Sequence, residues 1–237
     1  LQDTPIALTA VTASTIEDLD IKNVVDMAGI SPNVMLVETP SNNTSATIAM
    51  RGGVTINPAI TWEPTVGVYL DGVYLGKTQG AIFDVVDLER VEILRGPQGT
   101  LYGRNTLGGA INLISQRPNG SGVETKLTLG NYGLTQAQFT TDFEIGDGTY
   151  GKLVVNSKER DGYVHNAPGP FGGAQGVVPS ADPTVNELDT INSHGFRFTI
   201  ARDTDNSSFD LSVDYNDQSN TPPFAQLGYT IPNWSAA

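Results

Sequence analysis

The sequence predicts a small α+β domain followed by antiparallel β-strands of a transmembrane β-barrel. The first half of the chain, to about residue 117, carries mixed signals for short strands and short helices. From Glu124 onward, about five segments of roughly ten residues alternate apolar and polar side chains, and this is the length of a transmembrane β-strand. No run of about 18 apolar residues occurs, so a membrane-spanning helix is not predicted.

Local capping signals mark the first elements. Pro5–Thr12 is typical of a strand. The order Ser-Thr-Ile-Glu at Ser14–Glu17 is a capping box, which predicts the start of a helix. Asn23 and Asp26 repeat this pattern before an apolar run, and Gly29 then predicts the end of that helix.

Two further segments complete the pattern before the glycine-rich region. Thr47–Met50 predicts a strand that ends at Arg51-Gly52-Gly53. Val66–Leu75 alternates around Asp71-Gly72, which is the strongest short signal for a β-hairpin. Together these segments predict a small α+β domain with many loops.

The most informative segment is Leu88–Ser115. A short apolar strand, Val91–Leu94, leads into a bend with the rigid Pro97, and a second apolar strand follows. Glycine at high density serves backbone that adopts positive φ or approaches another surface closely. The bend contains Gly96, Gly99, Gly103, Gly108 and Gly109. No Gly-Lys-Ser/Thr follows, so a P-loop is excluded, and no helix N-terminus is predicted in the bend.

The second half of the chain changes to a two-residue period. In Leu134–Ile145, phenylalanine, alanine and isoleucine share one face, while glutamine, aspartate and glutamate share the other. Phe196–Ile200 and Phe209–Tyr215 show the same alternation. One apolar and one charged face suit a barrel wall between lipid and water. A soluble β-sandwich would give the same alternation.

The lengths of the connections favour the barrel over the sandwich. Asn131–Gly133 predicts a short outer loop, Gly146–Gly148 predicts a tight periplasmic turn, and Asp203–Asn206 predicts another tight turn. The connection at about 162–195 is long and rich in glycine, proline and asparagine. Short turns on the periplasmic side and longer loops outside are typical of outer-membrane barrels.

Composition excludes several classes of function. The net charge of −13 disfavours nucleic acid as a partner, because phosphates require a basic surface. The absence of cysteine excludes disulfides, zinc–thiolate sites and thiol catalysis. Neither His165 nor His194 has neighbours at metal-ligand spacing, so solvated loop residues are favoured over a metal site. No nucleophile–base pair or Gly-x-Ser-x-Gly motif is found, and we expect neither an enzyme nor a resident cofactor.

The run Leu-Arg-Gly-Pro, Leu-Tyr-Gly and Gly-Gly-Ala-Ile-Asn inside Leu88–Ser115 resembles the end of the plug domain of TonB-dependent outer-membrane receptors. The resemblance implies that residues 1–117 are the plug domain. It implies that residues 118–237 are roughly the first quarter of a 22-stranded barrel, an incomplete N-terminal part of it. The expected location is the outer membrane of a Gram-negative bacterium, in contact with its lipid.

The resemblance also implies a function and partners. Such a receptor binds a scarce extracellular solute, with a ferric siderophore as the default, and imports it by plug remodelling that TonB drives. The TonB box is not found in this chain and is expected upstream of it. A receptor for carbohydrates or other nutrients, a transducer that signals ligand occupancy, and a soluble interaction protein remain as alternatives.

The same resemblance assigns candidate residues. Arg51, Arg95 and Arg104 match the plug arginines that carboxylates of the barrel wall hold in this family, and the alternative is that they only stabilise the plug fold. Bidentate arginine pairs in a partly dry interface are strong. The plug signature comprises Gly52, Gly96, Pro97, Gly99, Tyr102, Gly103, Gly108 and Gly109.

Ligand contacts in the family come from the outer apices of the plug and from the outer loops. We expect the apices at Asn42–Ser45 and Thr55–Trp62, with Asn42, Asn43 and Trp62 as candidate ligand contacts. Trp62, Tyr69 and Tyr74 could stack on an aromatic or sugar ligand, although packing in the core is the commoner role of such side chains.

Overall fold

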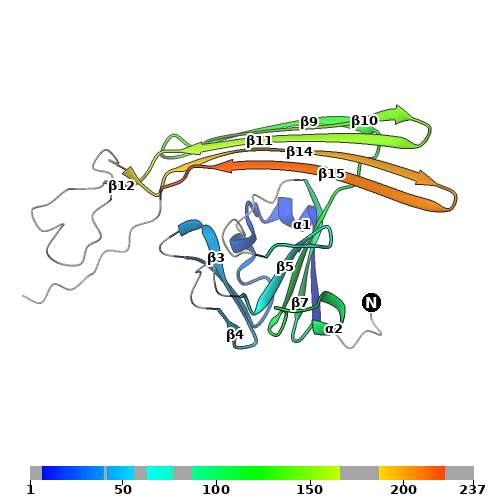
Figure 1. The fold of residues 1–237 in the computed structure, drawn as a ribbon. Helices are drawn as coiled ribbons and strands as arrows, with labels where there is room; N and C mark the ends of the chain where they lie inside the picture. The colour runs from blue at the N-terminus through cyan, green and yellow to red at the C-terminus, as the bar shows by residue number, and fades with distance from the viewer. Residues whose placement is uncertain (1–6, 40–41, 56–62, 77–86, 166–186, 222–237) are drawn as a thin grey trace, which may run out of the picture.

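The computed structural model describes residues 7–39, 42–55, 63–76, 87–165 and 187–221. A long five-stranded antiparallel sheet lies across an α+β part, which sits beneath one of its faces (Figure 1). Within the described residues, no helix is long and apolar enough to cross a membrane.

The α+β part is built on a five-stranded sheet in the order β1-β7-β8-β5-β6. The bounds are β1 Ala7–Thr12, β5 Val66–Leu70, β6 Val73–Tyr74, β7 Leu88–Arg95 and β8 Gly109–Ser115. Strands β5 and β8 run parallel, and the other neighbours are antiparallel. The core lies on this sheet, where Val91, Ile93 and Ile111 are completely buried.

Helix α1, Ala13–Asp18, follows β1 directly, and the predicted position of its cap was wrong. The N-cap is Thr12, whose hydroxyl accepts a hydrogen bond from the backbone N–H of Thr15. Ser14 lies inside the first turn, because the extended backbone of β1 continues to Thr12 and leaves that residue at the junction. Threonine and serine cap equally through a side-chain oxygen, so the sequence alone left the start uncertain by two residues.

The second capping box was predicted correctly. Asn23 accepts hydrogen bonds from the N–H groups of Val25 and Asp26, and the Asp26 carboxylate accepts one from the N–H of Asn23. The helix that it begins, η1 Val24–Met27, is a single 3₁₀ turn. Gly29 follows with a φ of 88°, as a chain reversal after a helix requires.

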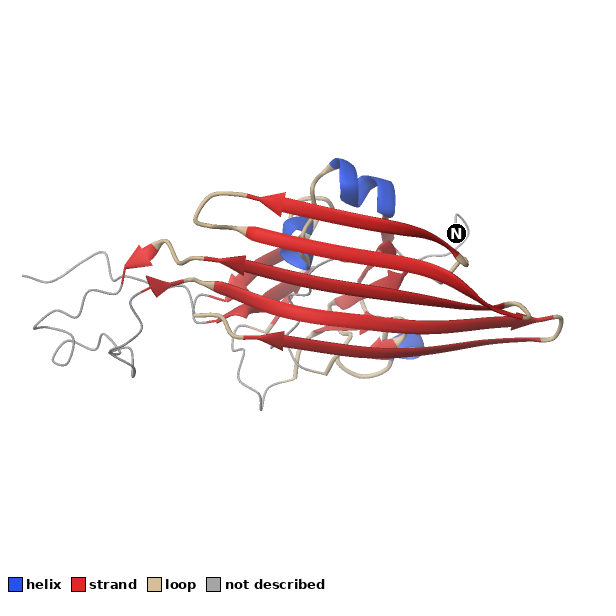
Figure 2. Ribbon diagram, turned by 90° about the horizontal axis from the view of Figure 1, so that it is seen from above, coloured by secondary structure: helices blue, strands red, loops and turns tan. Residues whose placement is uncertain are grey.

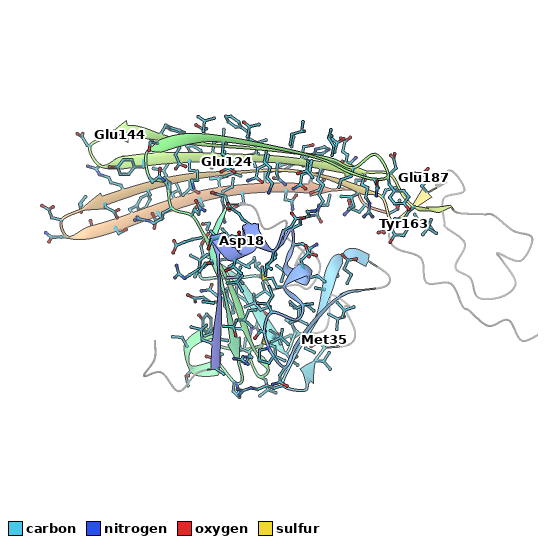
Figure 3. The ribbon with its side chains drawn as sticks, turned by 180° about the vertical axis from the view of Figure 1, so that it is seen from behind. Asp18, Met35, Glu124, Glu144, Tyr163 and Glu187 are labelled. Carbon is cyan, nitrogen blue, oxygen red and sulfur yellow. The ribbon has the colours of Figure 1, made fainter. Side chains whose placement is uncertain are left out.

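A second sheet contains β2 Val34–Thr39, β3 Asn42–Met50 and β4 Gly53–Val54. The predicted strand at Thr47–Met50 is therefore longer, and Asn42–Ser45 belongs to β3 instead of an irregular loop. The pairing with β2 is irregular here, since Thr39 pairs with Asn42 and Glu38 with Ala46, which leaves residues 43–45 without a partner in β2. The sequence analysis did not predict β2, in which Leu36 is buried while Met35 points outward (Figure 3).

The turn at Asp71-Gly72 was predicted correctly. Both residues have positive φ, 49° and 82°, as a two-residue hairpin turn between β5 and β6 requires. The glycine-rich bend between β7 and β8 differs from expectation, because it contains the short helix α2, Gly99–Tyr102. A four-residue helix carries no sequence periodicity and therefore no detectable signal.

The five predicted strands of the second half are all present. They are β9 Ser121–Leu129, β10 Thr135–Gly146, β11 Thr149–Arg160, β14 Ile191–Thr204 and β15 Ser207–Gln218. Each strand pairs with the next, giving the spatial order β15-β14-β11-β10-β9 (Figure 2). The predicted long connection is shorter at its C-terminal end, because β14 begins four residues before Gly195.

The two ends of this sheet differ. The tight turns after β10 and β14 lie at one end, where Glu144 is placed (Figure 3). The other end carries β12, Val164–His165, and β13, Glu187–Leu188, near Tyr163 and Glu187. Residues 166–186 of the predicted long loop lie outside the described residues.

The two faces of the sheet differ in chemistry, as the alternation predicted. Register places one set of large apolar side chains on the face away from the α+β part, and they are exposed. This apolar face comprises Val123, Leu127, Leu129, Phe139, Phe143, Ile145, Val155, Phe196, Phe209, Leu211, Val213 and Tyr215. The opposite, polar face carries charged residues and meets the α+β part.

Candidate functional site

The two parts of the chain meet through ion pairs on the polar face. At their centre is Lys152 of β11, whose side chain is only 3% exposed. Its ammonium nitrogen, Nζ, lies 3.0 Å from Asp87 Oδ1 and 3.5 Å from Asp142 Oδ2. Asp142 is the direct cross-strand partner of Lys152 on β10, whereas Asp87 comes from the α+β part, one residue before β7.

Burial makes this site electrostatically demanding. The side chains of Asp87 and Asp142 are each 9% exposed, so both need the ammonium group as a counter-charge. Desolvation raises the pKa of Asp87 above its ordinary value, while the charge of Lys152 acts in the opposite direction. The site binds one lysine between two carboxylates and has a net charge of −1.

The raised pKa of Asp87 predicts a pH dependence. A folded pKa above the unfolded value of 3.8 contributes stability that is fully present below that value and is lost as the pH rises through the folded pKa. Asp87→Asn removes this contribution, so the stability of the variant relative to the parent protein should rise as the pH rises from 3.8 through the raised folded pKa. Lys152, Asp142 and Arg197 are the charges that act on Asp87, and all remain in the variant. Urea midpoints of the full-length protein measure the difference, and a difference independent of pH would contradict the prediction.

A second cation, Arg197 of β14, also connects the two parts. Its Nη1 lies 3.1 Å from Asp71 Oδ2, and its Nε donates to Asp214 Oδ1 at 2.6 Å. Asp71 also accepts hydrogen bonds from the backbone N–H and the hydroxyl of Ser115, each at 2.8 Å. Asp71, which adopts positive φ in the turn, therefore also pairs its carboxylate with β14 of the long sheet.

The third cation, Arg117, lies in the short connection between β8 and β9. Its guanidinium contacts both carboxylate oxygens of Asp203, at 2.9 and 3.0 Å, and Asp210 Oδ1 at 2.7 Å. Hydrogen bonds to these carboxylates raise the pKa of Arg117 further above its usual range. The side chain is 44% exposed, so solvent screening reduces what the pairs contribute to stability.

The predicted lock arginines lie elsewhere. Arg95 ends β7, the strand that Asp87 precedes, so the two are about 25 Å apart along that strand. The Arg51 guanidinium lies against Gly96, where an added Cβ would come within 2.6 Å of its Nη1. Arg104 pairs with Glu63 at 3.3 Å, and both are exposed.

Within the described residues, none of these three arginines forms an ion pair with the long sheet of β9, β10, β11, β14 and β15. Arg95 Nη1 donates to the backbone carbonyl of Pro32 at 3.3 Å, while its buried Nε has no hydrogen-bond partner among the described residues. Their role as a lock therefore stays a prediction.

The signature residues shape the bend between β7 and β8. Gly109 approaches β7 so closely that an added Cβ would clash with the carbonyl oxygen of Leu94 and with Met50 Sδ. Gly96, Gly103 and Gly52 have φ of 101°, 80° and 82°, which favour glycine. Within the same signature, Gly99 and Tyr102 form the ends of α2, Pro97 precedes it, and Gly108 packs near Gly53.

Two tyrosines that were considered for ligand stacking pack inside the molecule. Tyr69 is 5% exposed, and its hydroxyl donates to the carbonyl of Tyr102 at 2.6 Å. Its ring lies 4.9 Å from the ring of Tyr102 and 5.3 Å from that of Tyr74. Of the ligand candidates, Asn42 and Asn43 lie in β3 and Trp62 lies outside the described residues, so their role stays a prediction.

The sequence analysis missed the residues that join the two parts. Alternation did place Asp142 and Arg197 on the polar face, but it could not identify their partners. Asp71 was recognised only as a turn residue, and nothing in the local sequence marks Asp87. A carboxylate 65 residues from its lysine partner gives no signal in a single sequence.

Comparison with known proteins agrees with this arrangement. Residues 1–110 match the family model for the TonB-dependent receptor plug domain. The catecholate siderophore receptor Fiu of Escherichia coli K12 is 31% identical over 165 residues, covering 67% of this chain and 20% of Fiu. The pesticin receptor of Yersinia enterocolitica is 33% identical over 114 residues, covering 48% of this chain and 16% of the receptor. FyuA, the ferric yersiniabactin uptake receptor of Yersinia pestis, has a crystal structure that covers 92% of this chain with a TM-score of 0.75, at 23% identity and over 32% of FyuA.

These findings define the class of protein first: an α+β plug seated on the polar face of antiparallel barrel strands. The chain belongs to the TonB-dependent receptors, and residues 1–110 match their plug domain. It spans about a fifth of the length of Fiu. Below, "plug" denotes the α+β part and "wall" denotes the sheet of strands β9, β10, β11, β14 and β15.

Proposed function

We propose that the protein is an outer-membrane receptor of a Gram-negative bacterium that binds a scarce extracellular solute and admits it to the periplasm by remodelling its plug. The observation that carries this proposal is the wall itself. One face is apolar and exposed, while the other carries Lys152 and Arg197 paired to the plug. A sheet that contacts lipid on one side and a polar interior on the other needs this division.

The open edges of the wall support a larger barrel. Strands β9 and β15 each pair on one side only within the described residues. Unpaired backbone groups are not tolerated in lipid, so we propose that further strands close the barrel around the plug. The tight turns after β10 and β14 would then face the periplasm, and the connection between β11 and β14 would face outward.

The proposed solute is an iron–siderophore complex. Support comes from the relatives, since Fiu is named as a catecholate siderophore receptor and FyuA as a ferric yersiniabactin uptake receptor. The proposed energy source is TonB, which would act on a segment upstream of β1. The chemistry of uptake requires binding and plug movement but no covalent step.

Uptake by the full-length receptor tests the proposal. A strain that lacks its other siderophore receptors and expresses this one should accumulate radioactive iron from a ferric catecholate or a mixed-ligand siderophore. Deletion of the gene for TonB should abolish the accumulation. Growth on scarce carbohydrate or cobalamin in place of iron uptake would assign the alternative nutrient class, and accumulation that persists without TonB would refute the proposed mechanism.

We also propose that Arg51, Arg95 and Arg104 lock the plug to the barrel strands opposite the described wall. Support comes from their position at the far end of β7 and from the buried Arg95 Nε, which has no partner within the described residues. An arginine placed in a dry interface needs a carboxylate partner there.

Arg95→Ala or Arg104→Ala should therefore reduce uptake or leave the pore leaky. Uptake of iron and sensitivity to a large antibiotic, both in the full-length receptor, measure the two effects. Arg90→Ala is the matched control, because Arg90 on the same strand pairs only with its neighbours Glu89 and Glu92 among the described residues. Normal uptake and normal antibiotic exclusion in both variants would refute the lock.

A further inference from the structure

Three cations join the plug to the wall, and each lies between two aspartates. The set that we call the seam comprises Lys152 with Asp87 and Asp142, Arg197 with Asp71 and Asp214, and Arg117 with Asp203 and Asp210. In the first two, the cation belongs to the wall and one aspartate belongs to the plug. The third begins in the connection between plug and wall and ends on the wall.

We propose that the seam stays closed during transport, that Lys152 is its central positioning residue, and that the solute passes along another side of the plug. This inference rests on the proposed transport function. It assigns a role to the seam residues, none of which is one of the three lock arginines. It also limits the passage to strands other than β10, β11, β14 and β15.

The burial of Lys152 is the first reason. Its ammonium group and both of its aspartates are almost fully buried, so opening the seam there would separate desolvated charges. Separating a buried pair is strongly unfavourable, because each group loses its partner before water can fully replace it. A gap for a bulky solute would need this separation at Lys152 and at Arg197 together.

The covalent connection is the second reason. Only residues 116–120 join the end of β8 to the start of β9, and five residues reach at most about 18 Å. Two of them bind the wall directly: Arg117 pairs with its two aspartates, and the backbone N–H of Asn119 donates to Asp142 at 3.1 Å. Asp142 therefore holds both the connection and Lys152, and the end of β8 is fixed at the wall.

The far end of the plug provides the contrast. The described residues give Arg51 and Arg95 no carboxylate partner, and Arg104 has only an exposed one. The exposed pair of Arg104 with Glu63 can exchange partners at lower cost than the buried Lys152.

A covalent tie across the seam tests the proposal. The 237 residues contain no cysteine. Asp87→Cys and Lys152→Cys are introduced together into a full-length receptor from which any cysteine elsewhere has been removed, and are joined by a short bifunctional thiol reagent. Iron uptake should stay within about twofold of the same variant before cross-linking, since a closed seam need not open. Uptake that falls more than about tenfold on cross-linking, with siderophore binding retained, would overturn the proposal.

The control for the reagent is Ser157→Cys with His194→Cys. These two residues are cross-strand partners on the apolar face of the wall, so their cross-link joins β11 to β14, which stay paired whether or not the seam opens. It should leave uptake unchanged.

Basal leak tests the positioning role of Lys152 without ligand or TonB. Lys152→Met in the full-length receptor should raise ion conductance in planar bilayers by about tenfold, and Lys152→Arg should restore most of the closure. Lys126→Met is the matched control, because Lys126 is an exposed lysine on the same face of the wall. A Lys152→Met conductance equal to that of the Lys126→Met control would overturn the role of Lys152, and it would do so even if wild-type receptor took up no siderophore.

Discussion

Lys152→Met is expected to lower the free energy of opening at β7 and β8 by about 3–5 kcal/mol, because it leaves Asp87 and Asp142 buried without a counter-charge. Methionine matches the length of lysine but cannot donate a hydrogen bond or compensate charge. Native-state amide hydrogen exchange in the full-length receptor measures the effect, since exchange reports the free energy of local opening.

Neutralising the stranded carboxylates gives the decisive comparison. Lys152→Met combined with Asp87→Asn and Asp142→Asn should recover most of the loss, because it removes the uncompensated charges. Lys126→Met should change exchange at β7 very little. If Lys152→Met behaves like Lys126→Met, the buried ion pairs do not hold the plug.

Gly109→Ala is the second substitution with a large expected effect. An added Cβ would clash with the Leu94 carbonyl oxygen and would lie 2.5 Å from Sδ of the fully buried Met50. The oxygen belongs to the backbone of β7, next to the residue that pairs with Gly109, so it cannot move without disturbing the ladder between β7 and β8. Overpacking of this kind costs about 3 kcal/mol or more when backbone must shift.

Hydrogen exchange at β7 and β8, together with the yield of folded receptor in the outer membrane, measures this effect. Gly99→Ala is the matched control from the same signature, because nothing lies within 4 Å of its added Cβ and its φ is not positive. Alanine should be neutral or slightly stabilising there, since Gly99 starts a helix. Equal losses in both variants would show that close packing at Gly109 is not what the signature requires.

Local chemistry explains which elements the sequence predicted. Asp71-Gly72 forms its turn because two adjacent residues need positive φ, and Asn23 with Asp26 caps a helix through neighbouring atoms. The wall was predicted because a two-residue period persists over five strands. Strand β2 and helix α2 were missed, because β2 depends on pairing with β3 and α2 is too short to show a period.

The lock that the resemblance implied stays a prediction, and the seam was not predicted. The sequence analysis expected plug arginines to meet wall carboxylates, whereas the described seam places Lys152 and Arg197 on the wall and aspartates on the plug. Charge on a polar face follows from alternation, but the choice of partner depends on how distant segments meet. Resemblance to a family could indicate the arginines because their motifs are local, and it gave no indication of Asp87.

The opposite placement of charge at the two ends of β7 gives the plug an electrical polarity across the barrel. Aspartates lie at the end that meets the wall, whereas Arg95 lies about 25 Å away at the other end of β7, with the Arg51 guanidinium against the next residue, Gly96. A plug rotated by half a turn about the barrel axis would bring arginines toward Lys152 and Arg197, and like charges would repel. In the barrel proposed above, we therefore expect the charge pattern to favour the described rotational setting, in addition to the short connection at residues 116–120.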